Sequence, residues 1–390
     1  MSLWLLVARD PLIFRDGKPF SAIPGERSKS MLFPYPATLA GAVRTRTATD
    51  ATTGKFDEKR IIDELKKIAV RGPVLVELDD NAQVKDWFFP APADALLVAK
   101  NDATMRHSLL PLNMPKNTLS DLEGMAMVGP LENIKDKPLS NPPRYWKWEQ
   151  MKEWLEKPMD GQVTLDELGI QGPERETRTH VSIDPGTQAA LSGALFQTSG
   201  MEFVQVERGK DETPKLKEAR SLALALDTET DILPGIGFLG GERRVVRWEM
   251  ADAKVSLPQC PVSIKEQIIE HGHCRLILGT PAYFLGGYLP SNLGSAHNLT
   301  ITVQAVALPR YQTISGWDYE KRIPKPTRRL TPAGSVYFLK LEGDKNSIGS
   351  FVDAVWLHSV SDDDQSRADG FGLALLGNWD GSLRTMEVRS

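Results

Sequence analysis

Short apolar runs bounded by turn residues constrain the fold of this chain more than any other feature of the sequence. Residues 3–8, LWLLVA, form an apolar run that ends in polar residues and a proline, which predicts a buried strand. Asp16 and Gly17 form a tight-turn pair between two apolar segments. The segment 33–48, FPYPATLAGAVRTRTA, predicts a helix whose first turn contains Pro36.

Strand-like runs with a few helices recur in both halves of the chain. GPVLVELD at 72–79 and RSLALALD at 220–227 read as strands, and CRLILGTP at 274–281 follows a predicted helix. The first helix comes directly after the first strand, as in a split βαβ unit of the ferredoxin type. The sequence therefore predicts an α+β protein with two related ferredoxin-like, RRM-like units, although no repeat is clear enough to establish a duplication.

The sequence predicts two units, and one long region within the first differs in character from the rest of the chain. Residues 1–230 are assigned to an N-terminal unit and residues 231–390 to a C-terminal unit. From about 100 to 177, prolines and polar residues interrupt the apolar runs except at 144–157, RYWKWEQMKEWLEK, which predicts a helix. We expect this region to be a large insertion in the N-terminal unit. The acidic segment 361–370, SDDDQSRADG, is expected to be a solvated loop poor in helix.

Composition narrows the class of protein. The 390 residues carry a formal net charge of −4, which argues against a surface covered in nucleic acid but not against a local basic groove. No stretch of about eighteen apolar residues could span a bilayer, and the first residues lack a basic region before their apolar run. We therefore expect a cytoplasmic protein without membrane contact. Two cysteines, Cys260 and Cys274, are too few for a disulfide framework.

Positive charge gathers at places without helical periodicity. These are Arg15 with Lys18, Arg27 with Lys29, Arg44 with Arg46, Arg243 with Arg244 and Arg247, and the loop containing Lys321, Arg322, Lys325, Arg328 and Arg329. In the loop, Pro324 and Pro326 exclude a helix interior, so its charges cannot be offset by acids four residues away. Arginine binds phosphate in a bidentate manner and stacks on unpaired bases. Each cluster alone is more often a solvated face, but together they predict an RNA-binding surface.

Aromatic residues accompany the basic clusters. They are Phe14, Phe20, Trp248, Trp317, Tyr319 and Phe371. Aromatic side chains beside basic loops are typical of proteins that bind single-stranded RNA, because unpaired bases stack on them.

Two alternative functions stay open at this point. His180, with a lysine or tyrosine as its partner, could serve a metal-independent endoribonuclease that processes precursor RNA, although its alternation with apolar neighbours is also that of an ordinary strand residue. A protein-only scaffold, with basic loops facing acidic partners, is the other alternative. An essential His180 would favour the nuclease, whereas absence of bound RNA would favour the scaffold.

The sequence offers no convincing metal or cofactor site. HGHC at 271–274 lacks the second ligand pair of a zinc site, and SDDD at 361–364 lacks the spacing of a calcium loop. GGERR at 240–244 has no following Gly-Lys-Ser/Thr, and GFG at 370–372 is too short for a dinucleotide fingerprint. We therefore expect neither a metal nor a cofactor.

Six segments, in order along the chain, resemble one protein family. They are DPLIFRDGKPF, FPYPATLAGAVRT, RTHVSIDPGTQAALSGALFQTSGMEF, FLGGERRVVRW, SGWDYEKRIPKPTRRLTPAGSVYFLK and GFGLALLGNW. Together they are similar to the RAMP-superfamily subunit of type III-B CRISPR (Cmr) effector complexes that caps the 5′ tag of the guide RNA. The resemblance covers both ends and the middle of the chain and leaves 100–177 unmatched.

The resemblance implies a fold and a function. The fold would contain two ferredoxin-like units and a glycine-rich loop near the C-terminus, at Gly370, Gly372 and Gly377. The chain would bind the constant 5′ tag of the crRNA and bridge the large polymerase-like subunit and the first backbone RAMP subunit of the same complex. It would meet the foreign RNA target only indirectly and would not be catalytic.

By position, the resemblance also places Arg178 at the start of a strand beside the RNA and the GGERR arginines on a hairpin near the guide. The basic clusters and the resemblance together predict one set of RNA-binding residues. The set is Arg15, Lys18, Arg27, Lys29, Arg44, Arg178, Arg243, Arg244, Arg322, Lys325, Arg328, Arg329, Gly370 and Gly372.

Overall fold

The structure is a computed structural model in which two compact units are built from alternating chain segments. It describes residues 1–15, 27–28, 30–57, 62–101, 103–113, 118–122, 124–206, 219–294, 297–318 and 323–385, with the backbone alone at 27–28 and 317–318. The first unit comprises Met1–Lys85, Pro173–Val255 and Thr313–Arg329, and the second comprises Asp86–Gly172, Ser256–Gln312 and Leu330–Ser390.

These bounds differ from the single boundary predicted between residues 230 and 231. Each unit has three segments because its sheet pairs strands that are far apart in the sequence. Most of the region predicted as an insertion in the N-terminal unit lies in the second unit. Both units mix helices with strands, so the predicted α+β class is confirmed.

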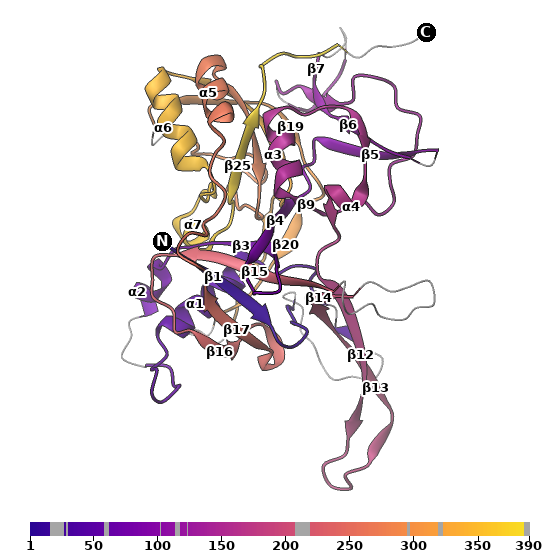
Figure 1. Ribbon diagram of the computed structural model, residues 1–390, viewed down its shortest axis with the longest axis vertical. Coiled ribbons are helices and arrows are strands. Elements are labelled where there is room, and N and C mark those ends of the chain that lie inside the picture. The colour runs from indigo at the N-terminus through magenta and orange to yellow at the C-terminus, as the bar shows by residue number, and fades with distance from the viewer. Residues whose placement is uncertain are drawn as a thin grey trace. The chain divides into compact units, whose positions relative to one another are not determined.

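The first unit contains an antiparallel sheet with the order β3-β15-β1-β17-β16 (Figure 1). The bounds of its central elements are β1 (Ser2–Ala8), α1 (Pro36–Thr47), α2 (Ile62–Lys67), β3 (Val70–Leu78), β14 (Val204–Gln205), β15 (Arg220–Thr228), β16 (Gly235–Phe238) and β17 (Val245–Met250). β14 pairs with the end of β15. A short 3₁₀ turn, Gly241–Arg243, precedes β17.

Apolar side chains of the central strands form the core of the first unit. Leu6 pairs with Leu224 on one side and with Trp248 on the other, and all three are buried. The helix α1 begins at Pro36, as predicted, and packs against β3. Burial of a large apolar side chain stabilises a fold by about 1.5–3 kcal/mol, so this row of strands is a rigid support for the loops that leave it.

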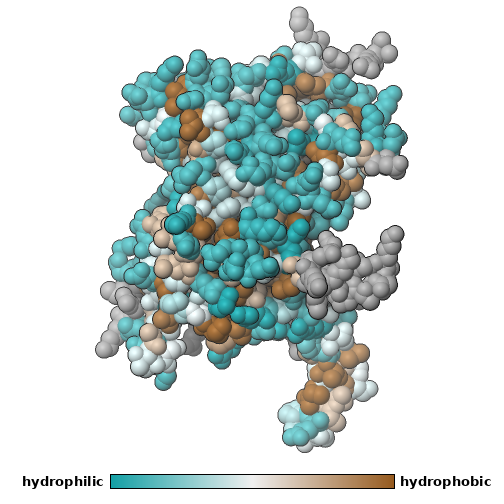
Figure 2. Space-filling model, viewed as in Figure 1, coloured by the Kyte–Doolittle hydropathy of each residue, from teal (hydrophilic) through white to brown (hydrophobic). Residues whose placement is uncertain are grey.

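A long β-hairpin leaves the sheet of the first unit (Figure 1). Its strands are β12 (Glu174–Ile183) and β13 (Ala190–Glu202), and β13 also pairs in parallel with β2 (Arg27–Ser28). The side chains near its base on β13 are buried, whereas those toward its tip are exposed. The exposed apolar residues of the outer half appear as brown atoms on the hairpin in Figure 2, and they are Val181, Ile183, Leu191 and Leu195.

The second unit contains a sheet with the order β19-β24-β18-β25, again antiparallel throughout. The bounds of this sheet and its helices are α5 (Val262–His271), β18 (His273–Leu278), β19 (Thr300–Ala307), β24 (Val336–Glu342), α6 (Lys345–Val355), α7 (Asp364–Asp369) and β25 (Ala374–Asn378). Asp344 caps α6 by accepting hydrogen bonds from the backbone amides of Asn346 and Ser347, at 2.9 and 3.0 Å.

The described residues form further helices and strands. They are β4 (Val84–Pro90), β5 (Ala95–Lys100), β6 (Ala103–Ser108), β7 (Leu110–Leu112), β8 (Met127–Gly129), β9 (Tyr145–Lys147), α3 (Trp148–Glu156), β10 (Gly161–Val163), α4 (Leu165–Leu168), β11 (Gly169–Ile170), β20 (Gln312–Ile314), β21 (Trp317–Asp318), β22 (Ile323–Pro324) and β23 (Arg328–Leu330). The helix predicted within 144–157 is α3, which buries Met151 and Trp154 and packs against β25. Among the described residues, no helix is long and apolar enough to cross a membrane.

The acidic segment at 361–370 is not the helix-poor loop that the sequence predicted. Residues Asp364–Asp369 form α7, and the Asp363 side chain caps it by accepting a hydrogen bond from the Ser366 amide at 2.7 Å. Six residues are too few to show a helical period, so the pattern of apolar residues could not reveal this helix. The capping aspartate was the available signal.

Candidate nucleic-acid interface

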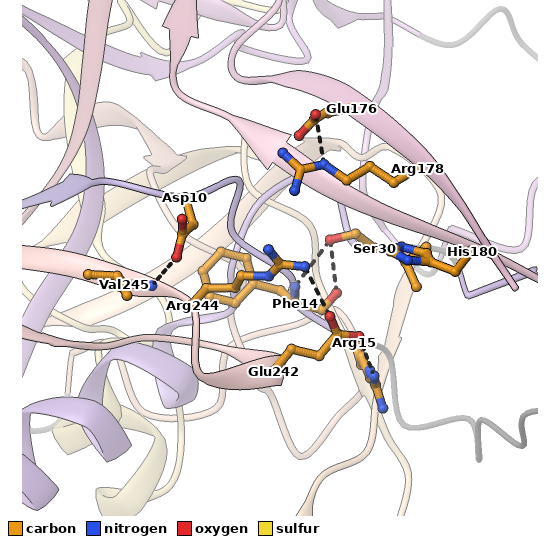
Figure 3. A network of polar contacts seen from close by, with 11 residues as sticks. Asp10, Phe14, Arg15, Ser30, Glu176, Arg178, His180, Glu242, Arg244 and Val245 are labelled. Atoms are coloured by element: carbon orange, nitrogen blue, oxygen red, sulfur yellow. Dashed lines mark hydrogen bonds and ion pairs between the residues drawn. The ribbon is translucent and has the colours of Figure 1, made fainter. Parts of the chain in front are cut away.

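Three arginines from distant segments gather in the first unit beside two glutamates (Figure 3). Arg15 follows β1, Arg178 lies on β12, and Arg244 immediately precedes β17. Glu242 contacts two of these arginines and Glu176 contacts the third. We call Arg15, Arg178 and Arg244 the arginine cluster. All three were predicted from the sequence to bind RNA, and the fold brings them to one place.

Glu242 joins two members of the arginine cluster. Its Oε1 accepts a hydrogen bond from Nη2 of Arg15 at 3.1 Å, and its Oε2 accepts one from Nη2 of Arg244 at 3.0 Å. The carboxylate thereby offsets the repulsion between two guanidinium groups. Because these side chains are partly exposed, the pairs add at most about 1 kcal/mol to stability, and their main consequence is the placement of the arginines.

A strained turn holds Glu242 in position. Gly240 has φ +77°, and a Cβ there would lie 2.5 Å from the carbonyl oxygen of Ile13. The amide of Gly241 donates a hydrogen bond to that same carbonyl at 2.7 Å. Glu242 itself has φ +58°, a left-handed conformation that is uncommon for a residue with a side chain. The glycine at position 240 therefore allows the turn to approach the segment that carries Arg15.

Arg178 is placed by the hairpin. Its Nε donates to Oε1 of Glu176 at 2.9 Å, and the two residues share a face of β12 because side chains alternate along a strand. This hydrogen bond raises the pKa of the Arg178 guanidinium, which stays charged. Asp10 fixes the neighbouring backbone by accepting a hydrogen bond from the Val245 amide at 3.0 Å.

Ser30 anchors the segment that follows the predicted basic residues Arg27 and Lys29. Its Oγ accepts a hydrogen bond from the Phe14 amide at 3.1 Å, and its own amide donates to Oγ of Ser199 at 3.0 Å. Ser30 is buried. The first unit therefore ties this segment both to the chain beside Arg15 and to the base of the hairpin.

The side chain of His180 contacts a hydroxyl group and an aromatic ring of the neighbouring strand. Its Nε2 lies 2.9 Å from Oγ1 of Thr198, and its ring stacks on Phe196 with centroids 5.2 Å apart and planes inclined by 20°. A general acid–base pair requires a second titratable group within hydrogen-bond reach. Among the described residues, the polar partner of His180 is a hydroxyl, not a lysine or tyrosine.

Other predicted arginines are used within the first unit. Arg44 donates a hydrogen bond to the carbonyl of Ile68 at 2.9 Å, and the Arg243 guanidinium lies over the Phe238 ring, 4.5 Å from its centroid. Arg46 donates to successive backbone carbonyls at 233–236. Arg44 and Arg46 use their guanidinium groups to bind backbone carbonyls of neighbouring segments. To contact RNA as predicted, each guanidinium would have to bind the backbone and the RNA together.

The second basic segment is extended, as its prolines predicted. Residues 323–324 form β22 and residues 328–330 form β23, with exposed chain between them. The Lys325 amide donates a hydrogen bond to the Gly316 carbonyl at 2.7 Å. Lys325 and Arg329 are exposed and Arg328 is half-buried. All three belong to the first unit, which also contains the arginine cluster.

Several predicted residues fall outside the described residues. They are Lys18, Lys29, Lys321 and Arg322. The backbone of Arg27 lies in β2, opposite Gln197 of the hairpin. The predicted roles of these residues in RNA binding stay predictions.

The sequence of the chain matches one protein family over nearly its full length. The model of the CRISPR-associated protein family Cas_Cmr3 matches residues 4–379. The chain belongs to the Cas_Cmr3 family. This result confirms the resemblance to a type III-B CRISPR subunit that the six segments indicated. A search of curated proteins found no match.

Solved structures of CRISPR complexes contain chains similar to this Cas_Cmr3 protein. A chain of the Type III-B Cmr-beta complex bound to cognate target RNA and AMPPnP is 16% identical, with a TM-score of 0.43, 90% of this chain covered and 87% of that chain. A chain of the same type of complex bound to cognate target RNA is 15% identical, with a TM-score of 0.45 and 86% of each chain covered. A chain of the Csm3-Csm4 subcomplex of the type III-A interference complex is 11% identical, with a TM-score of 0.34 and coverages of 88% and 94%.

The glycine-rich loop of this Cas_Cmr3 protein is packed in the second unit. Gly370 ends α7 with φ +93°, and its carbonyl accepts a hydrogen bond from Thr280 Oγ1 at 2.7 Å. Gly372 has φ +84°, and a Cβ there would lie 2.9 Å from the backbone nitrogen of Ser361. Both glycines are buried. Close packing of the chain on itself therefore explains these glycines, and their predicted contact with RNA stays a prediction.

The cysteines and histidines of this family member do not form a metal site in the described part of the chain. No group of three or more histidine, cysteine, aspartate or glutamate residues there could hold a metal ion. His273 Nδ1 lies 2.7 Å from the His271 carbonyl, at the end of α5. Burial raises the pKa of the Cys260 and Cys274 thiols to about 12, so both remain protonated at neutral pH.

Sequence reasoning missed the acidic residues of the interface. Glu176 and Glu242 each stand two residues before a predicted arginine, in the segments ERETR and GERR. The prediction of the RNA-binding surface rested on positive charge alone. On a strand, residues two apart share a face, so the Glu-x-Arg spacing in ERETR was a signal that Arg178 has an acidic partner. Glu242 lies in a 3₁₀ turn, where no strand periodicity could reveal its contacts.

Proposed function

We propose that this chain is a non-catalytic subunit of a type III-B CRISPR RNA-guided complex that binds the 5′ tag of the crRNA at the arginine cluster. Membership of the Cas_Cmr3 family supports a place in such a complex. The single observation that carries the RNA site is the convergence of Arg15, Arg178 and Arg244 from three distant segments onto one part of the first unit.

The chemistry of the cluster suits a sugar–phosphate chain. Three guanidinium groups and two carboxylates leave one net positive charge, and the guanidinium forks match the geometry of phosphate oxygens. The His180–Phe196 stack lies farther along the same hairpin and offers an aromatic face to an unpaired base. Phosphate contacts would fix the register of a constant tag, and base contacts would identify it.

We further propose that both units are ferredoxin-like. In chain order, the first unit has strands β1, β3, β15 and β17, and its sheet has the spatial order second-third-first-fourth. The second unit has β18, β19, β24 and β25 in the same spatial order. This order is that of a βαββαβ fold, in which each neighbouring pair is antiparallel. The first unit has α1 after its first strand and the second has α6 before its fourth.

In this proposal, other surfaces of the chain meet protein partners. The expected partners are the large polymerase-like subunit and the first backbone RAMP subunit, which this chain would bridge. The foreign RNA target would pair with the guide and meet this chain only indirectly. Such an arrangement agrees with a net charge of −4, because RNA would occupy a small share of the surface.

Photochemical crosslinking tests the proposed site. The purified complex is irradiated with its own crRNA, and the crosslinked peptides of this chain are identified by mass spectrometry. We expect crosslinks from tag nucleotides to peptides containing 10–15, 174–202 and 238–248. Crosslinks confined to the second unit, or none to this chain, would contradict the proposal.

The segment with Arg328 and Arg329 should contribute less than the cluster. Replacing both with alanine removes two charges from an extended segment of the first unit. We expect about a five- to tenfold loss of affinity for tagged RNA and a shallower dependence of log K on log salt, by about 1. Fluorescence anisotropy at several salt concentrations measures both. Unchanged affinity and slope would remove this pair from the interface.

A further inference from the structure

The turn between β16 and β17 keeps two consecutive residues in a conformation that their side chains disfavour. Glu242 has φ +58° and Arg243 has φ +51°. A left-handed backbone brings the Cβ atom of such residues close to the following carbonyl, whereas glycine adopts it freely. The chain therefore accepts backbone strain to place these two side chains, and strain of this kind is concentrated at binding sites.

The strained turn directs its two side chains to different partners. The Glu242 carboxylate lies between the guanidinium groups of Arg15 and Arg244 and accepts a hydrogen bond from each, at 3.1 and 3.0 Å (Figure 3). The Arg243 guanidinium instead lies over the Phe238 ring, 4.5 Å from its centroid. Glu242 is thus the residue that connects the strained turn to the arginine cluster.

The bridge made by Glu242 contributes little to the stability of the free chain. The side chains of Arg15 and Glu242 are 39% and 35% exposed, so water screens the attraction between them. Ordering two long side chains also costs conformational entropy. Because the ion pairs return so little, stability alone does not explain why a strained turn holds an acid here.

The bridge affects RNA binding in two opposite ways. A carboxylate beside a phosphate site repels the phosphate, and salt screens this repulsion at a partly exposed position. A carboxylate between two guanidinium groups also offsets their mutual repulsion and restricts their rotation before RNA arrives. A side chain that is already ordered loses less entropy on binding, which strengthens the complex. The persistence of the strained turn indicates that the second effect is the larger.

We propose that Glu242 is a positioning residue that strengthens RNA binding by holding Arg15 and Arg244 in the arrangement that receives phosphate groups, although its own charge repels RNA. This inference rests on the proposed function, since it concerns the same arginine cluster. Its consequence is opposite to that of simple electrostatics: removing a negative charge from the interface should weaken the binding of a polyanion.

Two charge-matched variants of the full chain test the direction of the effect. Glu242→Gln and Glu249→Gln each remove one negative charge that is paired with arginine. Glu249 is 34% exposed, and its Oε1 lies 2.9 Å from Nε of Arg247, outside the arginine cluster. Fluorescence anisotropy measures the affinity of each variant for an RNA that carries the tag. We expect Glu242→Gln to raise Kd about fivefold, the usual cost of ordering a side chain at an interface, and Glu249→Gln to change Kd by less than about twofold.

A third variant separates placement of the arginines from folding of the turn. Glu242→Gly removes the carboxylate, and glycine adopts the left-handed backbone without strain, so we expect the urea midpoint of unfolding to stay the same or rise. The Kd of this variant for the tagged RNA should nevertheless rise about fivefold. A purely structural role for Glu242 would move stability and affinity in the same direction.

A double-mutant cycle shows whether Glu242 acts through the arginines. In a chain that carries Arg15→Ala and Arg244→Ala, Glu242 has neither of these partners left to hold, so Glu242→Gln should change Kd by less than about twofold. An equal fivefold loss in that background would overturn the inference, because Glu242 would then act on RNA by another route.

The other outcomes separate this inference from the proposed function. If Glu242→Gln binds tagged RNA as tightly as the wild type or more tightly, its carboxylate only competes with phosphate, and the inference is overturned while the proposed function stands. If Glu249→Gln loses as much affinity as Glu242→Gln, or if Glu242→Gly loses affinity together with stability, placement of the arginines is not responsible and the inference is likewise overturned. If the wild-type chain binds no tagged RNA, both proposals fail.

Discussion

Replacing Arg15, Arg178 and Arg244 together with alanine should lower the affinity of the chain for tagged RNA by about a hundredfold. In the proposed site each arginine would make a charge-assisted contact with phosphate, and the loss of three such contacts at about 1 kcal/mol each gives this factor. Single-stranded RNA releases about 0.7 counterions per neutralised phosphate, so the slope of log K against log salt should become shallower by about 2.

A matched triple variant distinguishes the effect of the arginine cluster on RNA affinity from the effect of total charge. Lys152, Lys340 and Arg384 of the second unit are also partly exposed and paired with acids. Their replacement by alanine changes the net charge by the same amount and breaks the same number of surface ion pairs. We expect less than a threefold change in affinity for this control. Equal losses for the two triple variants would show that total charge, not the cluster, determines binding.

The strands could be predicted because their signals are local. Residues 3–8 lie within β1, and the runs at 72–79 and 220–227 contain most of β3 and β15. An apolar run of four to eight residues with turn residues at its ends needs no knowledge of its partners. The start of α1 at Pro36 is a similar local signal, since proline is pre-organised for the first turn of a helix.

The division into units could not be predicted in the same way. The chain leaves the first unit after Lys85, returns at Pro173 and returns again at Thr313. Each return depends on strand pairing between distant segments, such as β15 with β1, and no local pattern encodes it. The sequence pattern reveals where strands are but not which strands pair. A prediction without that pairing information divides the chain at a single point.

In the candidate site, too, the residue types could be predicted from the sequence but their arrangement could not. Arg15, Arg178 and Arg244 were predicted as separate elements of an RNA surface, and only the fold shows that Glu242 joins two of them. Arg44 had the same sequence signal, and its guanidinium donates a hydrogen bond to a backbone carbonyl. Charge alone cannot distinguish an arginine that faces a ligand from one that supports a loop, because both uses require the same guanidinium group.

Replacing Arg275 with methionine should destabilise the second unit by about 3–5 kcal/mol. Arg275 lies on β18, is fully buried and donates hydrogen bonds to the carboxylate of Asp94 and to the carbonyls of Trp154 and Asn378. Asp94 is also buried and accepts a hydrogen bond from Nε1 of Trp154 at 2.9 Å. Removing the cation leaves a buried carboxylate without its counter-charge, which is the costly way to break a buried pair.

A second substitution distinguishes the loss of the ion pair from poor packing. Asp94→Asn in the Arg275→Met background removes the uncompensated charge and keeps an acceptor for Trp154. We therefore expect this double variant to recover at least half of the lost free energy of unfolding, as measured by urea denaturation with circular dichroism. If the double variant is as unstable as Arg275→Met, lost packing and backbone hydrogen bonds are responsible. If recovery is observed, the instability of Arg275→Met comes mainly from the buried carboxylate of Asp94 left without its counter-charge.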